Sequence, residues 1–265
     1  MTDRDAGKRV LNVYALPNVV DPAELEGDVA VVVDVLRACT TIVYALASGA
    51  KEIVPCLEVS EALERAARLG VADVLLGGER QGFMIDGFDL GNSPGQYRPE
   101  IVSGKTVVFT TTNGTRAMDR CRRARRVYLA GFVNVSAVCE RLMNEHRVHI
   151  VCAGTKGEFS RDDILLAGLI VEKLAGRSGE TYSLNAQAIT ARENWREAFP
   201  LPCALGAEPI PADRLAQCLR QTAGGKNVIA VGCEEDVYHA AEVDRFDIVP
   251  ELDTREFVIR IAPKT

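Results

Sequence analysis

Short runs of β-branched residues alternate along this chain with longer segments whose apolar residues recur at helical spacing. The run VAVVV at 29–33 is apolar at every position, which is typical of a strand buried on both faces of a parallel sheet. The amphipathic segment at 60–70 predicts a helix with Ser60 as its N-cap and Gly70 at its C-terminus. The alternation predicts an α/β fold with three layers, αβα, and a largely parallel central sheet.

The same patterns predict the remaining elements. Strands are expected within 10–17, 51–59, 72–79, 105–110, 126–131, 147–154, 227–232, 246–253 and 255–262. Helices are expected within 36–50, 115–124, 134–146, 162–176 and 234–244, and in 181–224 with interruptions at 200–202 and 209–211. The Gly-rich stretch 80–99 is too long for a simple connector. We expect a single domain over residues 1–265, and a two-lobed arrangement around one active-site cleft stays open.

Composition and charge disfavour several classes of function. Hydrophobic residues make up 47% and charged residues 26% of the chain, as in ordinary soluble globular proteins. The net charge of −6, without a basic block, argues against non-specific binding of nucleic acid. The first residues lack the apolar core of a signal peptide, and no apolar stretch approaches a membrane span. We therefore expect a cytoplasmic protein without nucleic-acid or membrane partners, and a homodimer stays open.

Several common catalytic motifs are missing from the sequence. There is no P-loop, no G-x-G-x-x-G after the first strand, no nucleophile elbow G-x-S-x-G and no cysteine-phosphatase loop. Only three histidines are present, which disfavours a histidine nucleophile or a multi-histidine metal site. The eight cysteines form no C-x-x-C pair and are expected to be small buried residues, so Cys39 and Cys152 are not expected to be catalytic.

Polar residues follow five of the predicted strands. In open parallel sheets, ligands bind beyond the carboxyl ends of the strands, so these residues predict one shared site. They are Asp34, Arg37, Thr40 and Thr41; Glu79 and Arg80; Thr111, Thr112, Asn113, Gly114 and Thr115; Thr155, Gly157, Glu158, Ser160, Asp162 and Asp163; and Glu234, Glu235 and Asp236. Two alternatives stay open, because Asp162 and Asp163 could equally cap a helix and Arg37 could form a surface ion pair.

The stretch TTTNGT at 110–115 has two explanations. Thr and Asn bond their own backbone and Gly supplies a positive φ, so a turn is the more common one. Hydroxyls and N–H groups between a strand and a helix also suit phosphate, sulfate or carboxylate. The acids at the strand ends favour a hard cation such as Mg²⁺, which takes one or two carboxylates and shares the rest with water and phosphate. The candidate ligands are Asp34, Glu79, Asp89 and Glu158.

Five segments carry a resemblance to a known family. They are DVLRACTTI (34–42), GERQGFMIDGFDLGNSPGQY (78–97), TTTNGTRA (110–117), CAGTKGEFSRDDILLAG (152–168) and GCEEDVYHAAEVDRFDIVPEL (232–252). In this order, and over nearly the whole chain, they resemble the 2-phosphosulfolactate phosphatase family of coenzyme M biosynthesis. One departure is Cys39, where the family usually carries a small hydroxyl residue.

The resemblance implies a Mg²⁺-dependent phosphatase that hydrolyses 2-phospho-3-sulfolactate, or a related small anionic phosphoester, to 3-sulfolactate and phosphate. Catalysis is assigned to Asp34, Arg37, Glu79 and Asn113, and Mg²⁺ to Asp34, Glu79, Asp89 and Glu158. The substrate is expected to contact Thr40, Thr41, Arg80, Asn92, Ser93, Thr111, Thr112, Gly114 and Thr115. Water activated by the metal is favoured as the nucleophile, with Asp34 second. A non-catalytic sensor of a small phosphorylated metabolite is the alternative function.

Overall fold

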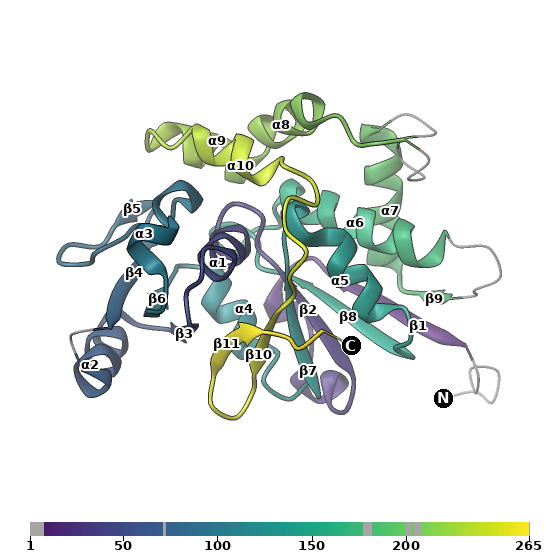
Figure 1. Ribbon diagram of the computed structural model, residues 1–265. Coiled ribbons are helices and arrows are strands. Elements are labelled where there is room, and N and C mark those ends of the chain that lie inside the picture. Colours follow the sequence, from purple (N-terminus) through teal and green to yellow (C-terminus); the bar gives the residue numbers. More distant parts are fainter. Residues whose placement is uncertain (1–7, 71–72, 177–181, 200–202, 204–207, 265) are drawn as a thin grey trace.

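The computed structural model describes residues 8–70, 73–176, 182–199, 203 and 208–264. In this part of the chain, eleven strands form one sheet in the order β5-β4-β6-β3-β11-β10-β7-β2-β8-β1-β9 (Figure 1). The strands are β1 Arg9–Tyr14, β2 Val29–Val33, β3 Glu52–Cys56, β4 Val74–Arg80, β5 Phe83–Met84, β6 Thr106–Thr110, β7 Arg126–Ala130, β8 Arg147–Cys152, β9 Tyr182–Leu184, β10 Pro250–Asp253 and β11 Val258–Ile261. The predicted α/β class with a largely parallel sheet is confirmed.

Helices flank this sheet. They are α1 Ala38–Ala47, α2 Val59–Leu69, α3 Pro99–Val102, α4 Gly114–Arg120, α5 Val135–Leu142, α6 Arg161–Ala175, α7 Ala186–Ala198, α8 Ala212–Gln221, α9 Ala223–Ala230 and α10 Glu235–Ala240. Short 3-10 helices lie at Pro17–Val19, Pro22–Leu25, Pro94–Gln96 and Phe132–Asn134. Within the described residues, no helix combines the length and apolar character that crossing a bilayer requires.

The continuous apolar run of β2 is explained by the burial of both faces of this strand. Val29, Val31 and Val33 belong to a core shared with α5, α6 and α7. Ala30 and Val32 belong to a second core, shared with α1 and α4 on the other face of the strand. Because helices cover both faces, every side chain of β2 is buried and a polar residue would be costly at any of its positions.

The hairpin β10–β11 joins two parallel half-sheets. The pairings β3–β11, β11–β10 and β10–β7 are all antiparallel, so in a flat sheet the two halves would direct their carboxyl ends to opposite edges. Residues at the ends of β4 and β6 nevertheless line the same cavity as residues that follow β2. The β11–β3 ladder pairs Ile259 with Ile53 alone. The cavity takes residues from both sets of strand ends.

The strand predicted at 227–232 is wrong, because these residues lie in α9 and the turn after it. The apolar run at 228–231 is too short for its pattern to separate a strand from a buried helix. The helix begins after Thr222, whose side-chain oxygen accepts a hydrogen bond from the Gly225 N–H at 2.9 Å. The fifth of the expected strand ends is therefore the end of a helix.

Smaller differences concern element ends. Ser60 is not the N-cap of α2, since the helix begins at Val59, whereas Gly70 ends it as predicted, with a φ of 90°. Strand β9 lies in a region that was expected to be helical. The predicted break at 209–211 precedes α8 and is confirmed. The break at 200–202 and residue 72 of a predicted strand lie outside the described residues, and the two-lobed arrangement stays a prediction.

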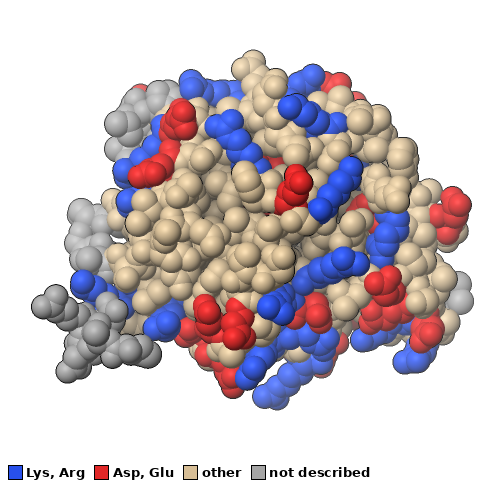
Figure 2. Space-filling model, turned by 180° about the vertical axis from the view of Figure 1, so that it is seen from behind, with Lys and Arg blue, Asp and Glu red and all other residues tan. Residues whose placement is uncertain are grey.

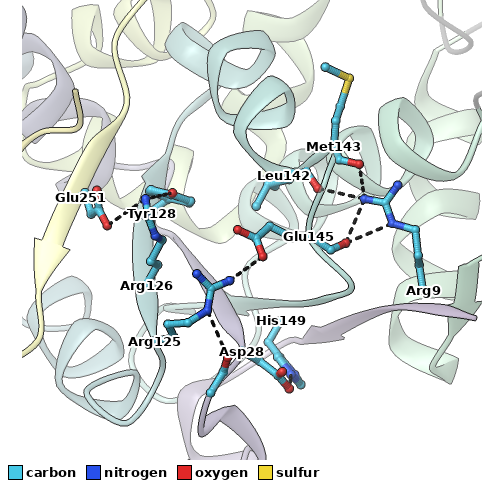
Figure 3. A network of polar contacts seen from close by, with 11 residues as sticks. Arg9, Asp28, Arg125, Arg126, Tyr128, Leu142, Met143, Glu145, His149 and Glu251 are labelled. Carbon is cyan, nitrogen blue, oxygen red and sulfur yellow. Dashed lines mark hydrogen bonds and ion pairs between the residues drawn. The ribbon is translucent and has the colours of Figure 1, made fainter. Parts of the chain in front are cut away.

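Charged side chains at the amino ends of β2, β7 and β8 are paired with one another (Figure 3). His149 Nε2 lies 3.1 Å from Asp28 Oδ2, and Arg147 donates to the same oxygen at 3.0 Å. Arg125 pairs with Glu145 at 2.5 Å. On the face seen in Figure 2, Lys and Arg are likewise interspersed with Asp and Glu. Because these cations already have acidic partners, the amino edge is a poor site for a small anion.

Candidate active site

A cavity of about 360 Å³ lies beyond the carboxyl ends of β2, β4, β6 and β8, with α9 as a further wall. This volume suits a small ligand. It is lined by Asp34, Leu36 and Arg37; Glu79, Gln81, Gly82 and Phe83; Asn92; Thr111, Thr112 and Asn113; Thr155 and Lys156; and Gly224, Asn227, Val228, Ala230 and Val231. The cavity therefore gathers segments that are far apart in the sequence, from both halves of the sheet.

Asp34 is the first residue after β2, and only 7% of its surface is exposed. Its Oδ1 accepts a hydrogen bond from the Ala38 N–H at 3.2 Å. The pKa of Asp34 is raised to about 7, chiefly by burial and also by the Asp162 and Glu79 carboxylates, while the Ala38 hydrogen bond and Arg37 act in the opposite direction. The Ala38 hydrogen bond and the Arg37 charge therefore do not offset the burial of the ionised form of Asp34.

Two further buried acids, Asp162 and Asp163, lie in the first turn of α6, where capping the helix was the alternative to a place in the site. Asp163 accepts hydrogen bonds from the Val35 N–H and the Gly154 N–H, both at 2.9 Å. It thereby ties the chain after β2 to the chain after β8. Asp162 accepts a hydrogen bond from the Ser160 hydroxyl. Burial raises the pKa of both carboxyls. Their contribution to the site is to fix neighbouring backbone segments by hydrogen bonds.

Glu79, at the end of β4, fixes two loops that line the cavity. Its Oε1 accepts a hydrogen bond from the Thr112 N–H at 2.8 Å, and its Oε2 accepts one from the Gly82 N–H at 2.7 Å. The carboxylate is 7% exposed and faces the cavity. Each oxygen keeps further lone-pair capacity, so Glu79 can hold these loops and still contact a cation.

The stretch TTTNGT is both a turn and a set of free polar groups. Thr115 N–H donates to Thr111 Oγ1 at 3.3 Å and Thr115 Oγ1 donates to the Thr111 carbonyl at 3.0 Å, which builds the turn. Thr112 Oγ1 is buried and has no hydrogen-bond partner among the described residues, as is also true of Asn92 Oδ1. Asn113 is the N-cap of α4 but makes no side-chain cap bond. Buried polar groups rarely remain unpaired, so Thr112 and Asn92 are available to a ligand.

Arg37 lines the cavity, and both terminal nitrogens of its guanidinium donate hydrogen bonds. Its Nη1 donates to Asp236 Oδ2 and its Nη2 to the Gly82 carbonyl, each at 2.8 Å. Asp236 also accepts a hydrogen bond from the Ser93 hydroxyl. Arg37 and Asp236 are 5% and 1% exposed. Arg37 therefore lines the cavity, and its ion pair is buried and not the surface pair that was the alternative.

Three residues that were expected to contact the substrate do not line the cavity but support the segments that do. They are Thr40, Thr41 and Gly114. Thr40 donates its hydroxyl to a backbone carbonyl at 2.8 Å, and Thr41 donates to the Asn92 carbonyl at 2.9 Å. Thr41 thereby holds the 80–99 loop against α1. At Gly114, a Cβ would lie 2.7 Å from Asp34 Oδ2, so this position needs glycine for the close approach of α4 to the acid.

Like Ser93 and Thr115, the predicted residues Arg80, Asp89 and Glu158 do not line the cavity. Arg80 turns away, with Nη2 donating to Thr110 Oγ1 at 2.8 Å. Asp89 is exposed, and its Oδ2 accepts a hydrogen bond from the Leu76 N–H at 2.8 Å. Glu158 is exposed in the turn after β8. A sequence position in a polar loop does not reveal the direction of a side chain, and we leave Asp89 and Glu158 out of the proposed metal site.

The sequence reasoning missed the roles of Lys156, Asn227 and Asp236. Lys156 is flanked by Thr155 and Gly157, which were noted as polar residues after a strand, and the same signal could have included it. Asn227 was predicted to lie in a strand, so its position in the cavity lining on α9 was not predicted. Asp236 was noted, but its pairing with Arg37 across 199 positions has no local signal.

The cavity residues fit a Mg²⁺ ion. Asp34 and Glu79 supply two carboxylates, whereas no cluster of three or more His, Cys, Asp or Glu residues in the described chain is arranged to hold a metal. Mg²⁺ is commonly bound by one or two carboxylates together with water and substrate phosphate. Cys39 and Cys152 are fully buried with raised pKa values and do not line the cavity. The available donors are therefore oxygens, as Mg²⁺ prefers.

Fold and site together define an α/β protein with a polar cavity for a small anion at the carboxyl ends of its strands. The profile of the family described as 2-phosphosulpholactate phosphatase matches residues 14–255. The chain belongs to this family, whose name denotes phosphoric monoester hydrolases.

Similar proteins carry the name Probable 2-phosphosulfolactate phosphatase. One from Caldanaerobacter subterraneus subsp. tengcongensis is 38% identical over 244 residues, which cover 91% of this chain and 95% of the relative. One from Symbiobacterium thermophilum is 40% identical over 245 residues, covering 91% and 98%. One from Thermotoga petrophila is 38% identical over 235 residues, covering 88% and 93%.

The raised pKa of Asp34 predicts a pH-dependent loss of stability in the metal-free protein. The unfolded chain releases this proton near pH 4, the folded protein near pH 7, so the folded state holds the extra proton between these values. The Asp34 contribution to the free energy of unfolding therefore falls as pH rises through this window. Asp34→Asn cannot ionise, and its stability relative to the unmodified protein should rise from pH 4 to pH 8 by up to ~4 kcal/mol.

The measurement is urea unfolding in EDTA at intervals between pH 4 and pH 8. Asp86→Asn, which changes an exposed aspartate, is the matched control and should follow the unmodified protein throughout. If the free energies of unfolding of Asp34→Asn and the unmodified protein differ by the same amount at every pH, the burial of Asp34 does not destabilise its ionised form.

The Arg37–Asp236 pair predicts strong non-additivity. Removing one member leaves the other as a buried, unpaired charge, which costs about 3–5 kcal/mol. We expect Arg37→Met and Asp236→Leu each to lower the free energy of unfolding by about 3 kcal/mol. The double variant should lose clearly less than the sum of the two, because neither charge remains. Additive losses in urea unfolding would contradict the pairing, and Ser93→Ala, which leaves the ion pair intact, should have a smaller effect.

Proposed function

We propose that the protein is a Mg²⁺-dependent phosphatase that hydrolyses 2-phospho-3-sulfolactate, or a related small anionic phosphoester, to 3-sulfolactate and phosphate. The observation that carries the proposal is one cavity containing a buried carboxylate of raised pKa, Asp34, together with the unpaired Thr112 hydroxyl. Membership of the family and the names of the relatives support the choice of substrate.

The loop after β6 supplies the phosphate contacts in this proposal. The Thr112 hydroxyl and the Asn113 amide would donate to phosphoryl oxygens, because neither is used in the turn. Glu79 holds the Thr112 backbone in place before the substrate arrives. Donors that are positioned in advance stabilise the charge that develops on the phosphoryl group during transfer. The unpaired Asn92 Oδ1 would accept a hydrogen bond from a water molecule in the same cavity.

Asp34 and Glu79 are the residues that would hold Mg²⁺. When bound, the ion would neutralise phosphoryl charge and promote the ionisation of water. Asp34 would then be held in its ionised form, opposite to the effect of its burial. Attack by Asp34 itself is the second route: its Oδ1 is occupied by the Ala38 N–H, which leaves Oδ2 as the attacking atom. Rapid acid quenching of a single turnover, with the substrate labelled by ³²P in its phosphoryl group, would distinguish the routes, because only direct attack transfers the label to Asp34.

The proposal extends to the cellular role implied by the sequence. A small anionic metabolite as substrate agrees with the expected cytoplasmic location and with a step of coenzyme M biosynthesis. The exclusion of nucleic acid rests on the net charge of −6, and a homodimer stays a prediction.

The direct experiment measures phosphate release from a panel of small phosphoesters that includes 2-phospho-3-sulfolactate. We expect hydrolysis with Mg²⁺, none after exhaustive chelation with EDTA, and recovery when Mg²⁺ is restored. Full turnover in excess EDTA would refute the metal requirement. Binding of the phosphoesters without phosphate release in any metal would favour the sensor instead.

Asn113→Ala separates a ligand contact from a structural turn. Loss of one positioned donor to a transferring group typically costs on the order of a hundredfold in turnover. We expect a loss of this size, weaker inhibition by inorganic phosphate and an unchanged melting temperature, because the amide makes no cap bond. Thr115→Ala is the control for the turn and should lower the melting temperature, since it removes the bond to the Thr111 carbonyl. An Asn113→Ala protein that melts several degrees lower and turns over normally would assign the amide to the turn.

A further inference from the structure

Two cations line the cavity, and they differ in what they already contact. The guanidinium of Arg37 is bound to Asp236 and to the Gly82 carbonyl. The ammonium group of Lys156 has no hydrogen bond or ion pair to any residue in the described part of the chain, although Glu158 is only two positions away. Lys156 is therefore the positive charge in the cavity wall that is free to meet a ligand.

The backbone holds Lys156 in a defined place. Thr155 N–H donates to the Glu158 carbonyl at 2.8 Å, and Glu158 N–H donates back to the Thr155 carbonyl at 3.1 Å. The two residues between them, Lys156 and Gly157, have φ values of 55° and 82°. This is the pattern of a tight turn with two left-handed residues, where Asn, Asp or Gly is normally preferred at the first position. A lysine there is unfavourable for the backbone, which points to a role for its side chain.

The base of this turn is tied to the core. Gly154, just before Thr155, donates its N–H to the buried carboxylate of Asp163, which also receives the Val35 N–H beside Asp34. The turn after β8 and the acid after β2 are thus fixed to the same side chain. Lys156 enters the cavity from β8, whereas Thr112 and Asn113 enter it from β6, in the other half of the sheet.

We infer that Lys156 is the specificity-determining residue that binds a second anionic group of the substrate, a carboxylate or sulfonate, while the phosphoryl group lies at the loop after β6. The inference rests on the proposed phosphatase function and names the substrate class more closely: phosphoesters with a second fixed negative charge. Arg80, which was expected to contact the substrate, does not take this role in the structure, because it turns away from the cavity.

The test compares Lys156→Met, Lys156→Arg and a control, Lys226→Met. Lys226 is an exposed lysine on α9 that does not line the cavity, so its variant removes the same charge from the same neighbourhood. The substrates are 2-phospho-3-sulfolactate and p-nitrophenyl phosphate, which lacks a second anion. We expect Lys156→Met to lose about tenfold or more in kcat/KM for the first substrate, mainly through KM, and under threefold for the second. Lys156→Arg should retain most of the activity, and Lys226→Met nearly all.

Calorimetric binding of 3-sulfolactate, which carries no phosphate, tests the same contact without turnover. We expect Lys156→Met to weaken this binding about tenfold and Lys226→Met to leave it unchanged. Equal losses on both phosphoesters, unaltered binding, or no binding of 3-sulfolactate to the unmodified protein would each overturn the role of Lys156. Absence of phosphate release from every phosphoester would instead refute the proposed function, and the binding experiment would still decide on Lys156.

Discussion

The burial of the Asp34 carboxylate is the constraint on which the rest of the site depends. A carboxylate that is 7% exposed and lies near Asp162 and Glu79 is unfavourable as an anion, and its pKa of about 7 records that cost. The one backbone N–H that bonds its Oδ1 does not offset the burial. Arg37 favours the ionised form but is paired with Asp236, so a bound cation would stabilise the Asp34 carboxylate further. Destabilisation of this kind is a usual consequence of building a functional site.

The fold creates this situation by bringing together strand ends that a flat sheet would separate. The β10–β11 hairpin reverses the direction of one half-sheet relative to the other, and residues from both sets of carboxyl ends nevertheless line one cavity. Two buried carboxylates then fix the loops. Glu79 bonds the loop after β6 and the hairpin after β4, while Asp163 bonds the segments after β2 and β8. The donors of the cavity are thereby positioned before a substrate binds, which is what phosphoryl transfer requires.

Local sequence signals predicted the parts of this arrangement that follow directly from a strand end. The α/β class, Asp34, Glu79 and the loop after β6 all come from apolar runs followed by polar residues, and the structure places these residues in one cavity. Arg80 ends β4, and because successive side chains of a strand point to opposite faces, it turns away from the cavity that Glu79 lines. Asp89 lies in a loop, where the direction of its side chain could not be predicted. Long-range pairing, such as that of Asp236 with Arg37, has no local pattern. The part of the cavity formed by α9 was not predicted, because the four apolar residues at 228–231 fit a strand as well as a helix.

The central claim is that Asp34 is largely protonated just below pH 7 in the metal-free protein and releases that proton to the buffer when Mg²⁺ binds. Titration calorimetry of Mg²⁺ binding at pH 6.5, in two buffers with different heats of ionisation, measures the proton release directly. The account predicts that most of one proton is released per ion bound, that the release disappears at pH 8, and that Asp34→Asn abolishes it. Mg²⁺ binding without proton release, unchanged in Asp34→Asn, would contradict the account.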